Sequence, residues 1–120
     1  MGATDYQKLW LRRADFRGRV NQVFRDVDLI LAPAQAVAGV TMAQVATFGT
    51  DAELFSAMLR YTCPFDLTGH PTITLPGGCA PNGAPVAFQF IAPHFSEALL
   101  VRAGWAWQRV TDWHRRHPGC

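Results

Sequence analysis

The sequence has very little lysine and serine. It contains a single lysine, Lys8, and only two serines, Ser56 and Ser96. Charged residues make up 17% of the chain, the formal net charge is +2, and the arginines are scattered along predicted helices. Nucleic-acid-binding surfaces concentrate positive charge on one face or in one run. We therefore expect no nucleic-acid partner.

Long hydrophobic runs and paired cysteines are also missing. No stretch approaches the roughly 18 to 20 apolar residues that span a membrane, and the start MGATDYQKLW lacks the apolar core and cleavage site of a signal peptide. The three cysteines, Cys63, Cys79 and Cys120, are widely spaced and form no CxxC pair. Neither a disulfide framework nor a zinc ribbon is indicated. We expect a cytoplasmic protein without a membrane partner.

Metal-ligand side chains recur with regular spacing only at the C-terminus. His114, His117 and Cys120 are three residues apart, so a helix would bring them onto neighbouring parts of one face. A basic helix end explains the same segment without a metal, because its histidines and arginines face the negative end of the helix dipole. We favour the second interpretation and predict no metal and no cofactor.

Helical periodicity is clearest at the two ends of the chain. Apolar residues recur at helical intervals over 5–26, and Thr4 with Gln7 has the spacing of a capping box. This pattern predicts a helix with one buried face. A second long helix is predicted from Ser96, its N-cap, almost to the end of the chain.

Two short helices are predicted in the middle. Thr50 and Glu53 have capping-box spacing, and the apolar stripe that follows should end near Thr62, ahead of Pro64. Pro64 can open a further helical turn that Gly69 would end in the left-handed conformation. The Ala-rich segment before this region has no clear period, so we expect an irregular connection there.

Three segments read as strands. The apolar run DLILAP (28–33) is typical of a central strand covered on both faces. TITLP (72–76) and PVAFQFIAP (85–93) flank the Gly- and Pro-rich segment PGGCAPNGAP, which we read as a turn, so these two strands should form an antiparallel hairpin. The order of elements predicts an α/β fold in which helices pack on a small mixed sheet.

Three segments carry a family resemblance: FRDVDLILAP, YTCPFDLTGHPTITLPGG and PNGAPVAFQFIAPHFSEALLVRAGWAWQRVTDWHRRHP. In this order they resemble the closing part of the amidase-signature family of amide hydrolases, and they cover most of 24–118. The chain departs from the family pattern at Ala87 and Ala92, where the family has glycine, and at Gln108, where it has glutamate. The resemblance implies the C-terminal part of an α/β/α fold.

The resemblance implies the chemistry of that family, in which a lysine activates a serine nucleophile through a second serine. Lys8 lies on a predicted helix, and neither Ser56 nor Ser96 is in a Gly/Ser-rich turn or beside another serine. The family's catalytic residues lie upstream of the matched region, so no catalytic residue is assigned. Residues 1–120 are therefore expected to form a single incomplete amidase-signature domain, inactive alone, and whether the chain counts as an enzyme stays open.

Substrate contact is implied for one segment. The family segment that matches residues 61–65 borders the pocket for the acyl part of the substrate, so Tyr61, Thr62 and Phe65 are the predicted substrate-binding residues of a complete enzyme. Core packing of the two aromatic side chains explains them equally well. His70 has no recognisable nucleophile motif near it in the sequence, and we assign it to loop geometry rather than catalysis.

Two classes of function remain open. The chain could be a C-terminal amidase fragment that needs an N-terminal amidase chain, and a small amide would then be a substrate only of the complete enzyme. An active pair of complementing chains is one form of this hypothesis. Alternatively, it could be a non-catalytic interaction module that covers its sheet edge with a partner or as a homo-oligomer. Four tryptophans and eight phenylalanines make exposed apolar surface a concern in either case.

Overall fold

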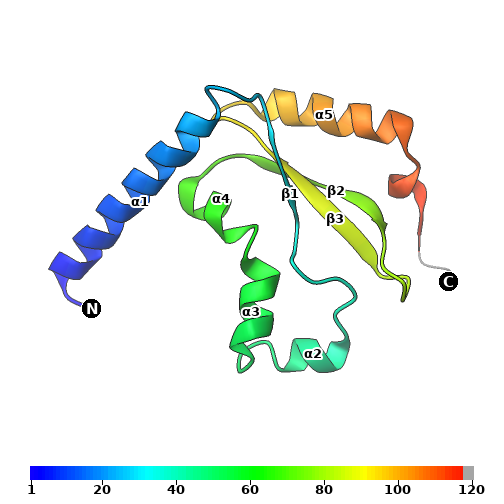
Figure 1. Ribbon diagram of the computed structural model, residues 1–120, viewed down its shortest axis with the longest axis horizontal. Coiled ribbons are helices and arrows are strands. Elements are labelled where there is room, and N and C mark those ends of the chain that lie inside the picture. Colours follow the sequence, from blue (N-terminus) through cyan, green and yellow to red (C-terminus); the bar gives the residue numbers. More distant parts are fainter. Residues whose placement is uncertain (118–120) are drawn as a thin grey trace.

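The computed structural model describes residues 1–117, which form helices around a small sheet (Figure 1). The elements in chain order are α1 (Ala3–Val23), β1 (Ile30–Pro33), α2 (Met42–Ala46), α3 (Ala52–Leu59), α4 (Cys63–Thr68), β2 (Thr72–Cys79), β3 (Pro85–Ile91), α5 (Glu97–Val110) and the 3-10 helix η1 (Trp113–Arg115). The predicted α/β class is confirmed.

The sheet has the strand order β1-β3-β2. The predicted hairpin of β2 and β3 is confirmed, and β3 pairs with both neighbours, so that Phe90 lies opposite Leu31 on one side and Ile73 on the other. Both pairings are antiparallel, whereas we expected a mixed sheet. β1 and β2 both run antiparallel to β3, which lies between them, so the long connection through α2, α3 and α4 crosses over β3 and does not join two paired parallel strands.

The segment PGG was expected to be a turn, but it lies inside β2. The pairing register shifts between Pro76 and Gly78, which marks a β-bulge. A Cβ on Gly77 would come within 2.8 Å of Cδ1 of Phe88, so glycine permits the close approach of the two strands. Gly- and Pro-rich composition therefore signalled a local irregularity correctly but misplaced the end of the strand.

The prediction that β1 is a central strand covered on both faces is wrong for the described residues. β1 lies at an edge of the sheet, and Leu31 is 65% exposed. Its continuous apolar run shows that the strand suits a covered environment. The run does not show whether the covering residues belong to the same chain.

The middle helices differ from the prediction mainly at their starts. The N-cap of α3 is Asp51, whose carboxylate accepts a hydrogen bond of 2.9 Å from the backbone N–H of Leu54. A capping box is present elsewhere, between Thr41 and Gln44, where it begins α2 in the segment that we expected to be irregular. The left-handed end of α4 at Gly69 is confirmed, with φ of 76°.

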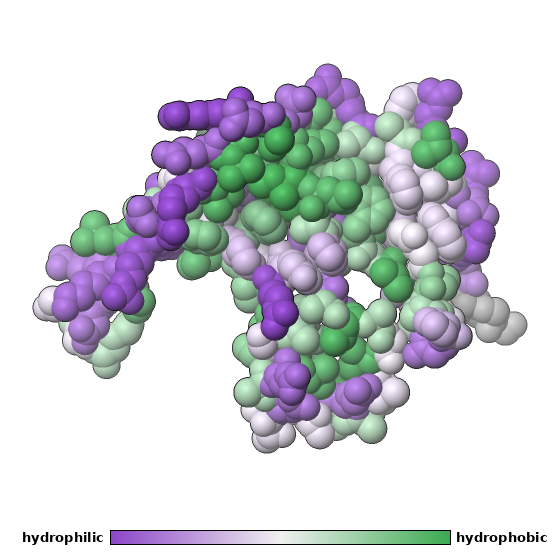
Figure 2. All heavy atoms as spheres, viewed as in Figure 1, coloured by the Kyte–Doolittle hydropathy of each residue, from purple (hydrophilic) through white to green (hydrophobic). Residues whose placement is uncertain are grey.

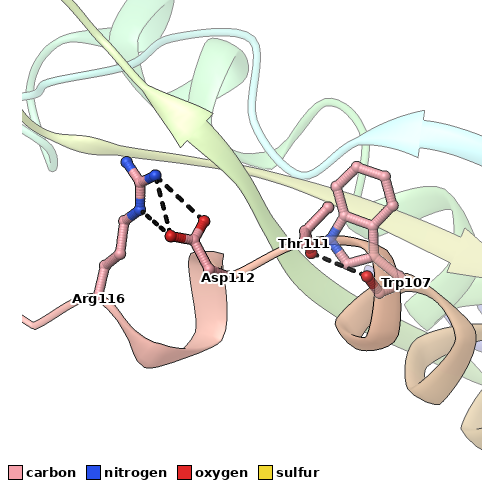
Figure 3. Close-up of polar contacts among 4 residues, drawn as sticks. All are labelled: Trp107, Thr111, Asp112 and Arg116. Carbon is pink, nitrogen blue, oxygen red and sulfur yellow. Dashed lines mark hydrogen bonds and ion pairs between the residues drawn. The ribbon is translucent and has the colours of Figure 1, made fainter.

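α5 covers part of the sheet but ends earlier than expected. The backbone becomes extended at Thr111, whose hydroxyl donates to the carbonyl of Trp107 over 2.8 Å, and Arg116 holds Asp112 by a bidentate ion pair (Figure 3). The Trp107 indole N–H donates to the carbonyl of Pro76 in β2. Ser96 precedes α5 but forms no side-chain capping bond.

α1 extends away from the sheet at one end of the molecule (Figure 1). The predicted buried face is not observed: none of its residues is buried, and Trp10 is 50% exposed. Its tertiary contacts include a hydrogen bond from Arg13 Nε to the carbonyl of Leu67 on α4. The apolar stripe is therefore present in the sequence but has no cover among the described residues.

Candidate functional site

A hollow of about 630 Å³ lies between the connection that follows β1, the end of α3 and the β2–β3 hairpin. Its lining includes Ala36, Met58, Thr62 and Thr74. The lining is small, polar in part and made by four different segments, which is the form of a small-molecule site. Of the three residues predicted to contact a substrate, Thr62 lines this hollow.

Tyr61 and Phe65 are placed beside the hollow rather than in its described lining. Both are half-buried. The carbonyl of Tyr61 accepts a hydrogen bond from the side chain of Gln89, and the carbonyl of Phe65 accepts one from the N–H of Gly69. The backbone of 61–65 is thus fixed on both sides of Thr62, while substrate contact by all three residues stays a prediction.

Gln89 is the residue that holds this wall together. It is only 2% exposed, and its Nε2 donates to the carbonyls of Pro33 (3.3 Å) and Tyr61 (2.6 Å). One amide group therefore joins β1, β3 and the connection between α3 and α4. The sequence analysis did not single out Gln89, although a lone polar residue within the apolar strand VAFQFIA is a signal that could have done so.

His70 lies at the other end of α4 and is 5% exposed. Its Nδ1 is 2.8 Å from the hydroxyl of Thr68, and its Nε2 is 2.9 Å from Oδ1 of Asn21. Burial lowers the pKa of His70 below 6.5, and the nearby His94 and Arg17 lower it further. A buried ring with both nitrogens hydrogen-bonded to side chains of its own scaffold serves structure, which agrees with our assignment of His70 to loop geometry.

The lysine and the two serines, the residue types that the family uses for catalysis, lie far apart along the chain. Lys8 is exposed on α1, Ser56 is exposed on α3, and Ser96 precedes α5. No hydrogen bond connects any two of these side chains within residues 1–117. A serine can be activated only by a base within hydrogen-bond reach. The described residues therefore assemble no catalytic serine.

The C-terminal segment considered for metal binding is only partly described. His114 lies in η1 and His117 follows it, but Cys120 is outside the described residues. Within residues 1–117, no group of three His, Cys, Asp or Glu side chains is arranged to hold a metal ion. Over the same residues, no helix combines the length and the apolar character required to cross a membrane.

Comparison with known protein families matches residues 1–101 to the family model "Amidase". The chain is 42% identical over 118 residues to a protein of Mycobacterium tuberculosis (strain ATCC 25618 / H37Rv) named "Putative amidase AmiD", covering 98% of this chain and 25% of that protein. It is 34% identical over 119 residues to a protein of Pseudomonas putida named "Amidase", covering 97% of this chain and 25% of that protein.

Among solved structures, a 6-aminohexanoate cyclic dimer hydrolase superposes with a TM-score of 0.86 at 23% identity, covering 98% of this chain and 27% of that one. At this identity the match concerns the fold. The chain spans about a quarter of the length of the relatives that it matches. The family match over 1–101, the shared fold and the motifs of 24–118 agree, and the chain belongs to the amidase family.

Proposed function

We propose that this chain forms the C-terminal part of an amide hydrolase and supplies one wall of its substrate pocket, with Tyr61, Thr62 and Phe65 next to the acyl part of a small amide. The observation that carries the proposal is the family match over residues 1–101 of a chain whose only lysine and two serines lie on separate elements. The chemistry would then come from residues that these 120 do not include, and residues 1–120 would be one incomplete domain.

The hollow beside Thr62 supports the pocket role. It is open, it is formed by segments that Gln89 ties together, and it presents a hydroxyl beside methyl and methylene groups. Such a surface can hold an acyl chain and orient one polar group of it. The widely spaced cysteines support a reducing compartment, and we propose the cytoplasm.

A chimera tests the proposal directly. The 118 matched residues of the mycobacterial relative are replaced by the corresponding residues of this chain, and the release of ammonia from small aliphatic and aromatic amides is measured. The chimera should hydrolyse amides, and this chain alone should release no ammonia above a blank. Hydrolysis by the lone chain would contradict the assignment of the chemistry to other residues. A folded chimera without activity would contradict the pocket role.

A second candidate function is a non-catalytic module that assembles with itself. The exposed apolar side chains of β1 and α1 favour it, because both would be covered in an oligomer. Light scattering of the purified chain separates the two candidates. A stable homo-oligomer of one defined size that does not form a complex with the catalytic region of a relative would favour the module.

A further inference from the structure

Three segments that are distant in the sequence meet at His70. Its ring is stacked between Phe24, at the end of α1, with ring centroids 5.2 Å apart, and His94, in the β3–α5 connection, with centroids 4.1 Å apart. Its two ring nitrogens form hydrogen bonds with the side chains of Asn21 of α1 and Thr68 of α4. We call these five residues the His70 joint.

Both hydrogen bonds can form with a neutral His70 ring. Oδ1 of Asn21 can only accept, so the Nε2–H of His70 donates to it. The Thr68 hydroxyl has one hydrogen, which it can donate either to the unprotonated Nδ1 or to the carbonyls of Pro64 (3.0 Å) and Phe65 (3.3 Å). A protonated ring could also be accommodated, since the hydroxyl can accept as well as donate. The hydrogen bonds therefore do not decide the charge of the ring, and its surroundings do.

Those surroundings oppose a positive charge. Burial is the largest cause of the lowered pKa of His70, followed by His94 and Arg17. The other groups in contact with the ring, from α1 and α4, are an amide, a phenyl ring and a hydroxyl, none of which carries charge. Nε2 of His94 is itself buried and has no hydrogen-bond partner among residues 1–117. His94 therefore offers the His70 ring no compensating negative charge.

Little else fastens this end of α1. None of the residues of α1 is buried, and among residues 1–117 its other long-range hydrogen bond is that of Arg13 to Leu67. Asn21 and Phe24 lie in the final turn of α1 and at its C-cap. The contacts of the His70 joint are therefore the ones whose loss would free the helix end.

We propose that the His70 joint is a pH-sensitive fastening, which holds the C-terminal end of α1 against α4 and the β3–α5 connection at neutral pH and releases it in mild acid. The sign follows from linkage. A histidine whose pKa is lowered by folding is neutral in both states above about pH 6.5, so its contribution is complete there. As the pH falls below 6.5, the released state takes up the proton first, and the joint weakens until the folded pKa is passed.

Hydrogen exchange of the whole chain measures the release. Exchange of the backbone amides of 17–24 is followed at pH 7.5 and pH 5.0 after correction for the intrinsic pH dependence of exchange. We expect protection in this segment to fall several-fold at the lower pH, while the amides of β3 keep their protection. Equal protection of 17–24 at both values of pH would overturn the proposal.

Two variants and a control assign the effect. His94→Phe keeps a stacked ring but removes one imidazole, so the pKa of His70, read from its Cε1–H resonance, should rise and the acid response of α1 should shrink. His70→Gln should abolish the response. His117→Gln removes an exposed histidine that follows η1 and should respond like the unaltered chain. If His70→Gln does not fold, His94→Phe decides, and an unchanged His70 titration in that variant would also overturn the proposal.

Discussion

Gln89 illustrates how much one residue contributes when its partners are backbone groups. Its side-chain amide donates to the carbonyls of Pro33 and Tyr61 in a position that is 2% exposed. Removing one partner of a buried hydrogen bond costs the desolvation of the group that is left, typically about 1–3 kcal/mol. We therefore expect Gln89 to contribute to the stability of the fold, although the sequence shows it only as one polar residue in an apolar strand.

Gln89→Leu tests this contribution. Leucine has a similar volume but no donor, so two carbonyls lose their partner, and the free energy of unfolding should fall by about 1–3 kcal/mol. Urea denaturation followed by circular dichroism measures the change. Gln108→Leu, at an exposed position of α5, is the matched control and should change stability by no more than about 0.5 kcal/mol. Equal effects at the two positions would contradict the role assigned to Gln89.

Thr62 is the residue at which the pocket proposal can be tested with little disturbance of the fold, since its hydroxyl donates within the chain only over a long 3.4 Å to the carbonyl of Leu59. Its hydroxyl is the polar group that the predicted site contributes to the hollow. In the active chimera, Thr62→Val keeps the shape but removes one hydrogen bond of about 0.5–1.5 kcal/mol, so kcat/KM for a substrate with a polar acyl group should fall roughly 2- to 12-fold. Thr72→Val, at an exposed position of β2, is the control. Unchanged kcat/KM in Thr62→Val would remove this residue from the site.

At the residue scale, the sequence predicted only what local rules and the family resemblance cover. Gly69 was predicted because a helix end favours a left-handed glycine, and Thr62 was singled out by resemblance. Gln89 and the partners of His70 were not, because the contacts that define them join residues 28 and 49 positions apart. No spacing rule connects such positions before the chain is folded.

At the scale of elements, the contact of α5 with β2 depends on a glycine. A Cβ on Gly104 would lie 2.8 Å from Cδ1 of Ile73 and 3.6 Å from Cδ2 of Leu75, and Gly104 is buried. Gly18 of α1, by contrast, has nothing within 4 Å of its would-be Cβ. Both positions are glycines within a helix. Comparing the same substitution at the two positions therefore separates the effect of packing from the effect of helix propensity.

Leucine substitutions at these two glycines should have opposite effects. Gly104→Leu places a large side chain against β2, and overpacking of this kind typically costs about 1–3 kcal/mol or more. Gly18→Leu adds a side chain at an exposed position whose Cβ has no neighbour within 4 Å, and it removes a helix-destabilising glycine, so α1 should gain up to about 0.8–1.0 kcal/mol. Urea denaturation measures the first change and helicity by circular dichroism the second. Destabilisation of similar size at both positions would show that α5 does not depend on close approach at Gly104.

Elements were predictable where their pattern is local. The N- and C-terminal helices and the hairpin strands follow from period and turn chemistry, and their observed bounds are Ala3–Val23, Glu97–Val110, Thr72–Cys79 and Pro85–Ile91. α2 was missed because one turn of helix has too few residues to show a period. β1 was wrongly predicted to lie in the middle of a sheet. Burial depends on the whole assembled protein, and an apolar run does not show which segments lie beside it.

At the scale of the whole molecule, the chain leaves too much surface uncovered for its size. Its accessible surface is 8637 Å², against about 6,500 Å² for a compact protein of this mass. The radius of gyration is 17.1 Å, against about 14 Å for a compact domain of this length. Figure 2 shows hydrophobic residues gathered over the sheet and beside α5. An apolar hollow of about 580 Å³, lined by Leu31, Phe88, Phe90 and Trp107, opens there.

This excess has the size of an obligate interface. About 2,000 Å² of additional surface on one partner exceeds the roughly 800 Å² per partner of a standard complex. Within the described residues, the uncovered apolar groups include side chains of β1 and α1, the two elements whose expected burial was not observed, and further side chains of α2, α3 and α5. Relatives that are four times longer provide chain that can cover such a face. The proposed remainder of the hydrolase is thus also the proposed cover.

Denaturant dependence of the isolated chain tests this conclusion. Folding of the lone chain removes about 55% of the surface of an unfolded chain of this mass, against about 66% for a compact domain. Because the m-value is proportional to the surface exposed on unfolding, the urea m-value of the lone chain should be about one sixth smaller than that of compact proteins of 120 residues. The dye ANS should bind to the lone chain, and its fluorescence should fall when the catalytic region of a relative is added. A monomer with a full-sized m-value and no ANS binding would mean that β1 and α1 are covered within the chain itself, and the proposed interface would then have no surface left to occupy.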